Sequence, residues 1–304
     1  MRRREFMTLF GAAAVWPLAA HAQQPAKIRR IGYLGSIQTF QNENTEAFNQ
    51  ELREAGYVDG QNMLLETRLH QRTLDRIDEF SRELVALKCS VIFATNPYAI
   101  RAVMKATSTI PIIGLDLDLE SDPVSELGGK QIELLKEAVP MVARLAVLWD
   151  ATIGIVQFSA TEMAARPSGV TLESLPIRSV EDIKDSIERA AREQVHGLVV
   201  LTSPLIFNER SRIADLALKT RLPTISLYNS FPKVGGLMAY GPNLASMFKR
   251  AASYVDRILS GVNPGELPIE RPSKFELVIN LKTANALGLK VSPTLIARAD
   301  EVIE

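Results

Sequence analysis

The chain has 304 residues, with 35 basic and 35 acidic side chains and a single cysteine, Cys89. This balance gives no electrostatic footprint for nucleic acid or an anionic membrane surface, so we expect no nucleic-acid partner. One cysteine excludes an intrachain disulfide, and the apolar residues around Cys89 predict a buried structural thiol. Stability must therefore come from a hydrophobic core.

The first 22 residues resemble an export signal. Arginines at 2–4 precede an apolar stretch at 9–20, which is shorter than the ~20 residues that span a membrane. Small side chains at Ala20 and Ala22 suit a signal peptidase. We expect cleavage after Ala22 and a soluble periplasmic chain with a net charge of about −2. The paired arginines favour twin-arginine export, and the general route also accepts a basic leader.

Apolar runs alternate with amphipathic stretches, which predicts an α/β fold with parallel sheets covered on both faces. In the first series, strands are expected at 28–34, 63–68, 91–95 and 110–116, and helices at 45–55, 74–87 and 97–107. In the second, strands are expected at 145–150, 170–177, 197–202, 224–228 and 236–240, and helices at 130–139, 154–165, 180–193 and 209–220. Two series in succession predict two Rossmann-like lobes.

Polar residues follow the expected strands of both series. Parallel sheets bind ligands at the carboxyl ends of their strands, where helix N-termini offer free N–H groups. Any one of these residues could be an ordinary turn residue, but together they favour one binding site between the lobes. The candidate ligand-binding residues are Ser36, Thr95, Asn96, Asp116, Asp150, Thr152, Ser203, Tyr228, Tyr240 and Asn243.

Asp116 and Asp118 form the most chemical-looking pair. An Asp-x-Asp after an apolar strand resembles the nucleophile and acid of haloacid-type phosphohydrolases. Glu120 stands where that motif has a hydroxyl residue, so a hinge role is favoured, with Asp122-Pro123 turning the chain out of the first lobe.

Other enzyme motifs do not occur in the sequence. Phosphate-binding loops, the serine-hydrolase elbow and the zinc-protease helix are all missing. His70 and His196 have no partner nearby in sequence and are predicted at surface or turn positions. We expect no catalytic residue, no metal and no cofactor.

A family resemblance is carried by six further stretches in fixed order. They lie at 31–35, 55–62, 106–112, 133–140, 235–241 and 274–284. Together with the leader they resemble the ABC transporter substrate-binding proteins related to the tryptophan/tyrosine-type periplasmic binders. The resemblance implies a monomeric type I periplasmic binding protein whose lobes close around a small solute and deliver it to an inner-membrane permease. The implied lobes are 23–117 with 242–272, and 118–241 with 273–304.

One segment departs from the family pattern. Between Asp122 and Lys130 the chain is too short for the helix and crossing strand that relatives have there. This predicts an exposed sheet edge in the first lobe, two full crossings at 240–243 and 273–280, and one short link.

Three functions are compatible with the sequence. The favoured one is the solute receptor of an ABC importer, for an amino acid or an aromatic carboxylic acid, because helix N-termini suit a carboxylate and Tyr228 and Tyr240 could stack on a ring. The alternatives are a ligand-sensing module for a membrane receptor and a metal-dependent phosphohydrolase at Asp116 and Asp118.

Overall fold

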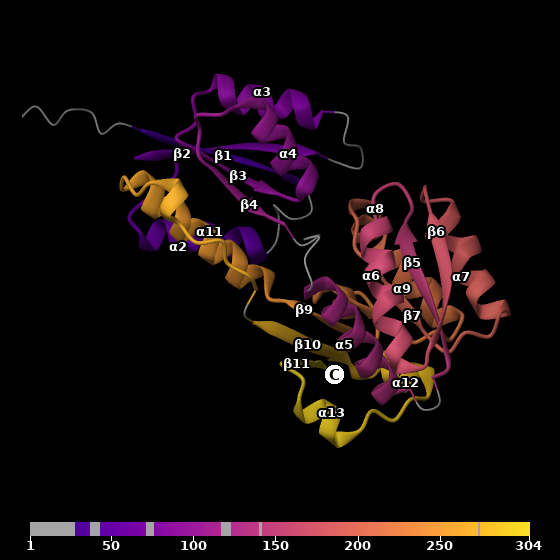
Figure 1. The fold of residues 1–304 in the computed structure, drawn as a ribbon. Coiled ribbons are helices and arrows are strands. Elements are labelled where there is room, and N and C mark those ends of the chain that lie inside the picture. The colour runs from indigo at the N-terminus through magenta and orange to yellow at the C-terminus, as the bar shows by residue number, and fades with distance from the viewer. Residues whose placement is uncertain (1–27, 37–42, 71–75, 117–122, 140–141, 273) are drawn as a thin grey trace, which may run out of the picture.

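The chain folds around two separate sheets. The computed structural model describes residues 28–36, 43–70, 76–116, 123–139, 142–272 and 274–304. Figure 1 shows the two sheets side by side, each with its own helices, and β9 and β10 at the side of the second sheet that leads to α11. The expected export signal and Asp118 lie outside the described residues.

The first sheet is parallel, in the order β2-β1-β3-β4. Its strands are β1 (Arg29–Ser36), β2 (Met63–His70), β3 (Val91–Thr95) and β4 (Ile112–Leu115). Helices α3 (Ile77–Ala86) and α4 (Pro97–Ala106) cover one face, and α2 (Glu43–Glu54) and α11 (Leu244–Leu259) cover the other. Both faces are therefore buried, which explains the almost continuous apolar strands.

Phe93 of β3 is central to the core on the α11 side. Its ring stacks on Phe48 of α2 at 5.1 Å and meets Tyr33 and Phe248 edge to face at 5.5 and 5.2 Å. Phe248 lies more than 120 residues further along the chain than β4, so this cluster brings α11 back to the first sheet. Edge-to-face pairs add to the free energy gained by burying the rings.

The second sheet has seven strands in the order β11-β10-β9-β8-β7-β5-β6. They are β5 (Arg144–Asp150), β6 (Thr171–Ile177), β7 (Leu198–Val200), β8 (Thr224–Ser226), β9 (Met238–Pro242), β10 (Phe275–Asn280) and β11 (Glu301–Ile303). All pairs are parallel except β9 with β10.

Helices cover both faces of this sheet too. They are α5 (Pro123–Ala138), α6 (Ile155–Ala165), α7 (Asp182–Arg192), α8 (Pro204–Asn208), α9 (Arg210–Lys219), α10 (Ser230–Lys233), α12 (Leu281–Leu287) and α13 (Pro293–Ala297), with 3-10 turns η1 (Arg166–Ser168) and η2 (Pro264–Glu266). The side chains of α7, α9 and α10 share one core cluster, and those of α5, α12 and α13 share the other.

The expected start of the helix at 130 is wrong. Helix α5 begins at Pro123 and is continuous through Gly128 and Gly129. Pro123 therefore opens a helix, where its missing N–H costs nothing. The glycines fit because α6 packs closely there: a Cβ at Gly128 would lie 3.3 Å from the Cα of Thr161. This close packing of two helices offsets the poor helix propensity of the glycine pair.

The two expected full crossings are present. β9 and β10 are antiparallel neighbours, with Pro242 opposite Phe275, and they lead into and out of the segment that carries α11. β4 has β3 as its one neighbour in the described sheet, so it is an edge strand, as expected. We propose that the lobes follow the boundaries expected from the sequence.

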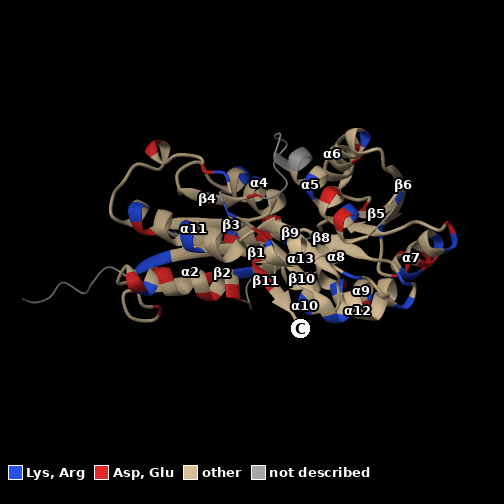
Figure 2. Ribbon diagram, turned by 90° about the horizontal axis from the view of Figure 1, so that it is seen from below, with Lys and Arg blue, Asp and Glu red and all other residues tan. Residues whose placement is uncertain are grey.

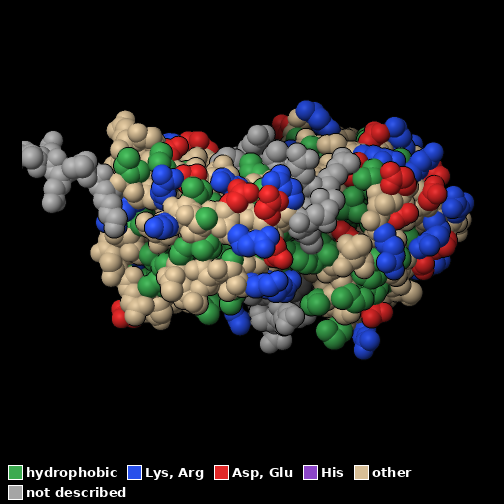
Figure 3. Space-filling view, turned by 90° about the horizontal axis from the view of Figure 1, so that it is seen from above, with side chains coloured by type: hydrophobic (Ala, Val, Ile, Leu, Met, Phe, Trp, Pro, Cys, Tyr) green, Lys and Arg blue, Asp and Glu red, His purple; other side chains and the backbone are tan. Residues whose placement is uncertain are grey.

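Charged side chains lie mainly on the helices. Figure 2 shows most acids and bases on helices and uncharged residues along β7, β8 and β9 of the second sheet, and Figure 3 shows both signs interspersed over one face of the molecule. Within the part of the chain that the structure describes, no helix has the length and apolar character needed to cross a membrane.

Candidate functional site

The carboxyl ends of the first sheet carry four of the expected residues. Ser36 ends β1, Thr95 ends β3, Asn96 caps α4 and Asp116 follows β4. Thr95 is buried, and its Oγ1 lies 3.3 Å from the hydroxyl of Tyr33. The parallel strands thus bring these residues to one edge of the sheet.

Asn96 is held in an unusual conformation. Its φ is 94°, a region that side chains other than glycine rarely adopt. The Asn96 Oδ1 accepts from the N–H of Ala99 at 2.9 Å, which turns Nδ2 toward Nε2 of His70 at 3.1 Å. Because an amide nitrogen only donates, Nε2 of His70 accepts and the ring proton lies on Nδ1.

The sequence prediction for His70 is wrong. His70 ends β2 and is 2% exposed, so it is neither a surface nor a turn residue. It lies opposite Ser36 of β1 and contacts Asn96, and the polar residues around it in sequence do not reveal these contacts. His196 fits the prediction: it lies exposed in a turn, where its Nδ1 accepts from the N–H groups of Ala143 and Arg144, both at 3.1 Å.

The second sheet brings Asp150, Thr152 and Ser203 to the ends of β5 and β7. Asp150 is buried, and its Oδ1 accepts from the N–H of Thr152 at 2.9 Å and from its hydroxyl at 2.5 Å. Ser203 is buried and caps α8, accepting from the N–H of Ile206 at 3.0 Å. These oxygens therefore shape the loops at the edge of the sheet.

A ring cluster follows β7 and β8. Tyr228 meets Phe207 of α8 edge to face at 5.0 Å, and the guanidinium of Arg210 lies 4.4 Å from the centre of the same Phe207 ring. Arg210 shares a helix face with Ile213, Ala214 and Ala217, which are buried against the sheet. The guanidinium therefore lies over the ring of Phe207, at the N-terminal end of α9.

Arg210 is a cation without a carboxylate. Among the described residues no acid lies within ion-pair distance of it, and its one hydrogen bond runs from Nη1 to the carbonyl of Phe207 at 2.8 Å. Burial lowers the pKa of Arg210, because removal from water disfavours the charged form. Its Nε is buried without a partner, as are both side-chain polar atoms of Asn208 and the Oδ1 of Asn229. Unsatisfied polar atoms of this kind call for a ligand or water.

The crossing strands place the last two expected residues. The Tyr240 ring stacks on Phe275 at 6.0 Å, and its carbonyl accepts from Nε2 of Gln131 at 2.9 Å. Asn243 caps α11 through Oδ1, which accepts from the N–H of Ser246 at 2.6 Å.

Glu276 joins the crossing strands. Its carboxylate accepts from Asn229 at 2.8 Å and from Asn243 at 2.5 Å, and it pairs with Lys274 at 2.9 Å. Burial alone would raise the pKa of Glu276, but the bonds from Lys274 and Asn243 outweigh it and hold the pKa below its usual value. Three segments of the chain therefore meet at one ionised carboxylate.

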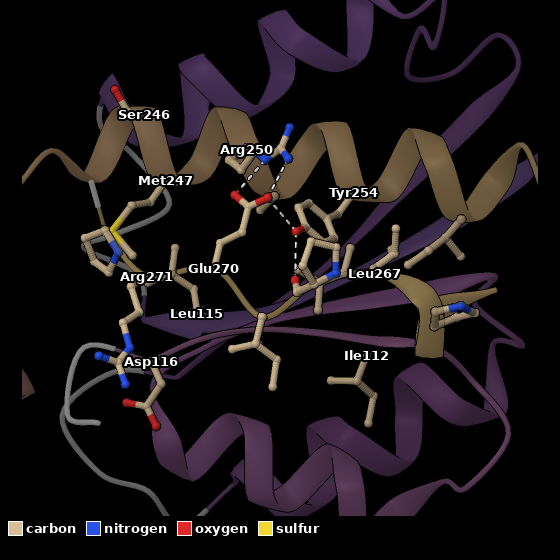
Figure 4. A pocket seen from close by; sticks show the side chains of 18 of the residues that line it. Ile112, Leu115, Asp116, Ser246, Met247, Arg250, Tyr254, Leu267, Glu270 and Arg271 are labelled. Atoms are coloured by element: carbon tan, nitrogen blue, oxygen red, sulfur yellow. Dashed lines mark hydrogen bonds and ion pairs between the residues drawn. The ribbon is translucent and has the colours of Figure 1, made fainter. Parts of the chain in front are cut away.

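A pocket of about 370 Å³ lies beside this junction. Figure 4 shows it between β4, α11 and the segment that follows η2, with Asp116 at one end. It contains Asp116 and Asn243 of the expected residues but runs along the outer edge of the first sheet, away from β7 and β8.

The described residues hold no group of three or more acids, histidines or cysteines that could bind a metal. Cys89 is buried as expected, and burial raises the pKa of its thiol to about 11, so at neutral pH it is a protonated, unreactive group.

Comparison with known proteins identifies relatives over most of the chain. Residues 41–303 match the family model described as ABC transporter substrate binding protein. A tyrosine-binding protein of Clostridioides difficile (strain R20291) is 22% identical over 265 residues, covering 81% of this chain and 76% of the relative.

Two solved structures share the fold. A conserved domain protein from Vibrio cholerae has a TM-score of 0.80 at 20% identity, and an ABC domain from Streptococcus pneumonia in complex with L-Trp has 0.78 at 18%. Each comparison covers 91% of this chain and 100% of the other. The α/β fold with two lobes, expected from the sequence, is confirmed.

Proposed function

Because the chain belongs to the family of ABC transporter substrate-binding proteins, we propose that it is the periplasmic receptor of an importer. In this proposal residues 1–22 are removed on export, and the monomeric product carries a small solute to a permease in the inner membrane without catalysing a reaction. The fold supports this role, because two lobes joined by crossing strands can close around one ligand.

The proposed ligand is an amino acid or an aromatic carboxylic acid. The observation that carries it is the guanidinium of Arg210, which is partly buried, has no carboxylate among the described residues and lies over the ring of Phe207, which in turn meets Tyr228 edge to face. A ligand carboxylate would pair with Arg210 while a ring packs on the aromatic side chains. The names of two relatives, a tyrosine-binding protein and a domain in complex with L-Trp, are in keeping with this class.

We propose two kinds of site residue. Asn96, Asp150, Ser203 and Asn243 use a side-chain oxygen to hold a helix cap or turn, so they would position the loops and contact the ligand through remaining atoms. The others would contact it directly; they are Ser36, Thr95 and Asp116 from the first lobe, and Thr152, Arg210, Tyr228 and Tyr240 from the second lobe and hinge.

The test is a ligand screen on residues 23–304. Thermal shift followed by isothermal titration calorimetry would compare L-tyrosine, L-tryptophan, other amino acids and aromatic acids with their amides, with sugars and with polyamines. Stabilisation by the acids and not by the matched amides is expected, because the amide lacks the charge that Arg210 would bind. Stabilisation by sugars or cations alone would refute the proposed ligand class.

A further inference from the structure

Among the described residues, the outer edge of β4 has backbone groups without a hydrogen-bond partner. The carbonyls of Pro111 and Leu115 accept from Ile92 and Asn96 of β3 and the turn after it, at 2.9 and 3.0 Å. In a parallel pair, alternate residues point their backbone groups to the same neighbour. The N–H and C=O groups of Ile112 and Gly114 therefore point away from β3, and no described residue bonds to them.

The pocket beside this edge, here called the edge groove, is bounded by β4, by α11 residues 246–258, and by residues 264–272 and Lys274. Met247, Ala251, Tyr254 and Ile258 of α11 form an apolar roof. The groove is thus a slot beside a free strand edge, under a helix that already covers the rest of the sheet.

The wall opposite β4 is fixed by α11. Arg250 donates to both carboxylate oxygens of Glu270, at 2.8 and 2.5 Å, and the hydroxyl of Tyr254 lies 2.7 Å from Glu270 and 2.8 Å from the carbonyl of Pro268. Figure 4 shows these bonds bridging from the helix to the segment. Ile269 in the same segment is 97% exposed.

The charges along the groove cancel. Arg250 pairs with Glu270 and Lys274 pairs with Glu276, and Asp116 and Arg271 bring one charge of each sign to one end. Its occupant should therefore be uncharged and apolar. A small apolar molecule would bury the backbone groups of Ile112 and Gly114 without partners, which is unfavourable.

A second copy of the chain does not fit this place. A four-residue strand is about 13 Å long, so its edge offers far less than the roughly 800 Å² per partner of a standard interface. Another sheet edge would also bring the helices that cover its own sheet. These helices would clash with α11 and with residues 264–272, which already flank the groove.

We propose that the edge groove binds an uncharged, extended peptide segment of another protein, which adds to β4 as a fifth strand. Its backbone pairs with Ile112 and Gly114, and its alternate apolar side chains lie under α11. This site shares Asp116 and Asn243 with the proposed solute site, but its other lining residues are different and it does not depend on the identity of the solute.

The test uses residues 23–304 and the fluorescein-labelled peptide acetyl-Thr-Val-Thr-Val-Thr-Val-amide. Two control peptides carry N-methyl groups on all three threonines or on all three valines, which removes the donors along one edge or the other and leaves the side chains intact. We expect binding by fluorescence polarisation, weakened about tenfold or more by at least one methylation pattern, because a strand needs the donors that face β4. No binding of the parent peptide, or equal binding of all three, overturns the proposal.

A variant of the chain locates the site. Of the backbone groups, Ile112→Pro removes only the outward N–H, since the bonds to β3 come from residues 111, 113 and 115, and Ile112→Ala is the control for loss of the partly buried side chain. We expect Ile112→Pro alone to lose peptide affinity by about tenfold or more. Unchanged affinity in a folded Ile112→Pro protein overturns the site, as does a dimer in sedimentation velocity that this substitution dissolves. If Ile112→Pro does not fold, the methylated peptides on the native chain still decide.

Discussion

Replacing Arg210 by methionine should affect the empty and the liganded protein differently. In the empty protein the guanidinium makes a cation–π contact with Phe207 and one hydrogen bond to its carbonyl. Such contacts stabilise by roughly 0.5–1 and 1.5–3 kcal/mol. The cost of burying a charge that has no carboxylate partner opposes this stabilisation. The lowered pKa of Arg210 reflects the same cost. We expect these terms to cancel to within about 1 kcal/mol, or 2–4 °C in Tm.

The liganded protein should respond strongly. If Arg210 binds the ligand carboxylate, removing it leaves that charge unpaired in the site, at a cost of about 2–5 kcal/mol and hence roughly 30-fold or more in affinity. Arg210→Lys should lie between, because a lysine keeps the charge but loses the planar fork. Titration calorimetry with the best amino acid of the screen and thermal unfolding without ligand would measure both effects.

Arg212→Met is the matched control. It lies on the same helix but is exposed, with one long hydrogen bond of 3.3 Å to the carbonyl of Val180. It should leave affinity unchanged. A fall in Tm of well over 4 °C in Arg210→Met at unchanged affinity would contradict a role in ligand binding, since Arg210 would then be a structural residue.

Three further substitutions test the fold and hinge. Phe248→Ala should cost about 3–5 kcal/mol in urea unfolding, because Phe248 anchors α11 to Phe93; a loss below 1 kcal/mol would contradict this packing. Gly128→Val should destabilise by about 1–3 kcal/mol against α6, whereas Gly129→Ala, whose Cβ would lie 3.6 Å from Ala164, should be tolerated; equal effects of the two would disprove the close packing. The pKa of Glu276 is lowered in the folded protein, so its stabilising contribution is present above the unfolded value of about 4.3 and is lost as pH falls through the folded pKa. The Tm difference between wild type and Glu276→Gln should therefore be constant from about pH 5 to 8 and shrink in acid; a difference independent of pH would show that the carboxylate charge is not involved.

Most strands of both sheets could be predicted from the sequence because they read as short apolar runs, but β11 was not predicted. β3 agrees at both ends and β5 within one residue of the predicted range. The start of α5 could not be predicted, because a proline after an aspartate fits a turn as well as a first helical turn. The glycines lie inside the helix because Gly128 packs closely against α6, a tertiary contact that the local sequence does not reveal.

The candidate site shows the same limit. The polar residues after the strands could be identified because turns and helix caps depend on local sequence. In the structure, however, the side-chain oxygens of Asn96, Ser203 and Asn243 already accept hydrogen bonds as helix caps. Arg210 was missed because its significance lies in what surrounds it: a ring beneath it and no acid within reach. The positions of residues along the chain do not show whether a charged side chain has a partner of opposite charge in the folded structure.

Asn243 connects the hinge with both proposed sites. Its Oδ1 caps α11, its Nδ2 binds Glu276 at the start of β10, and its N–H donates to the carbonyl of Lys274 at 3.0 Å. Rotation of α11 relative to β10 must therefore strain at least one of these bonds. Because Asn243 also lines the edge groove, a strand bound there would bias the same rotation that closes the lobes on a solute. Coupling of this kind is reciprocal, so a solute that favours closure must change peptide affinity by the factor by which the peptide changes solute affinity.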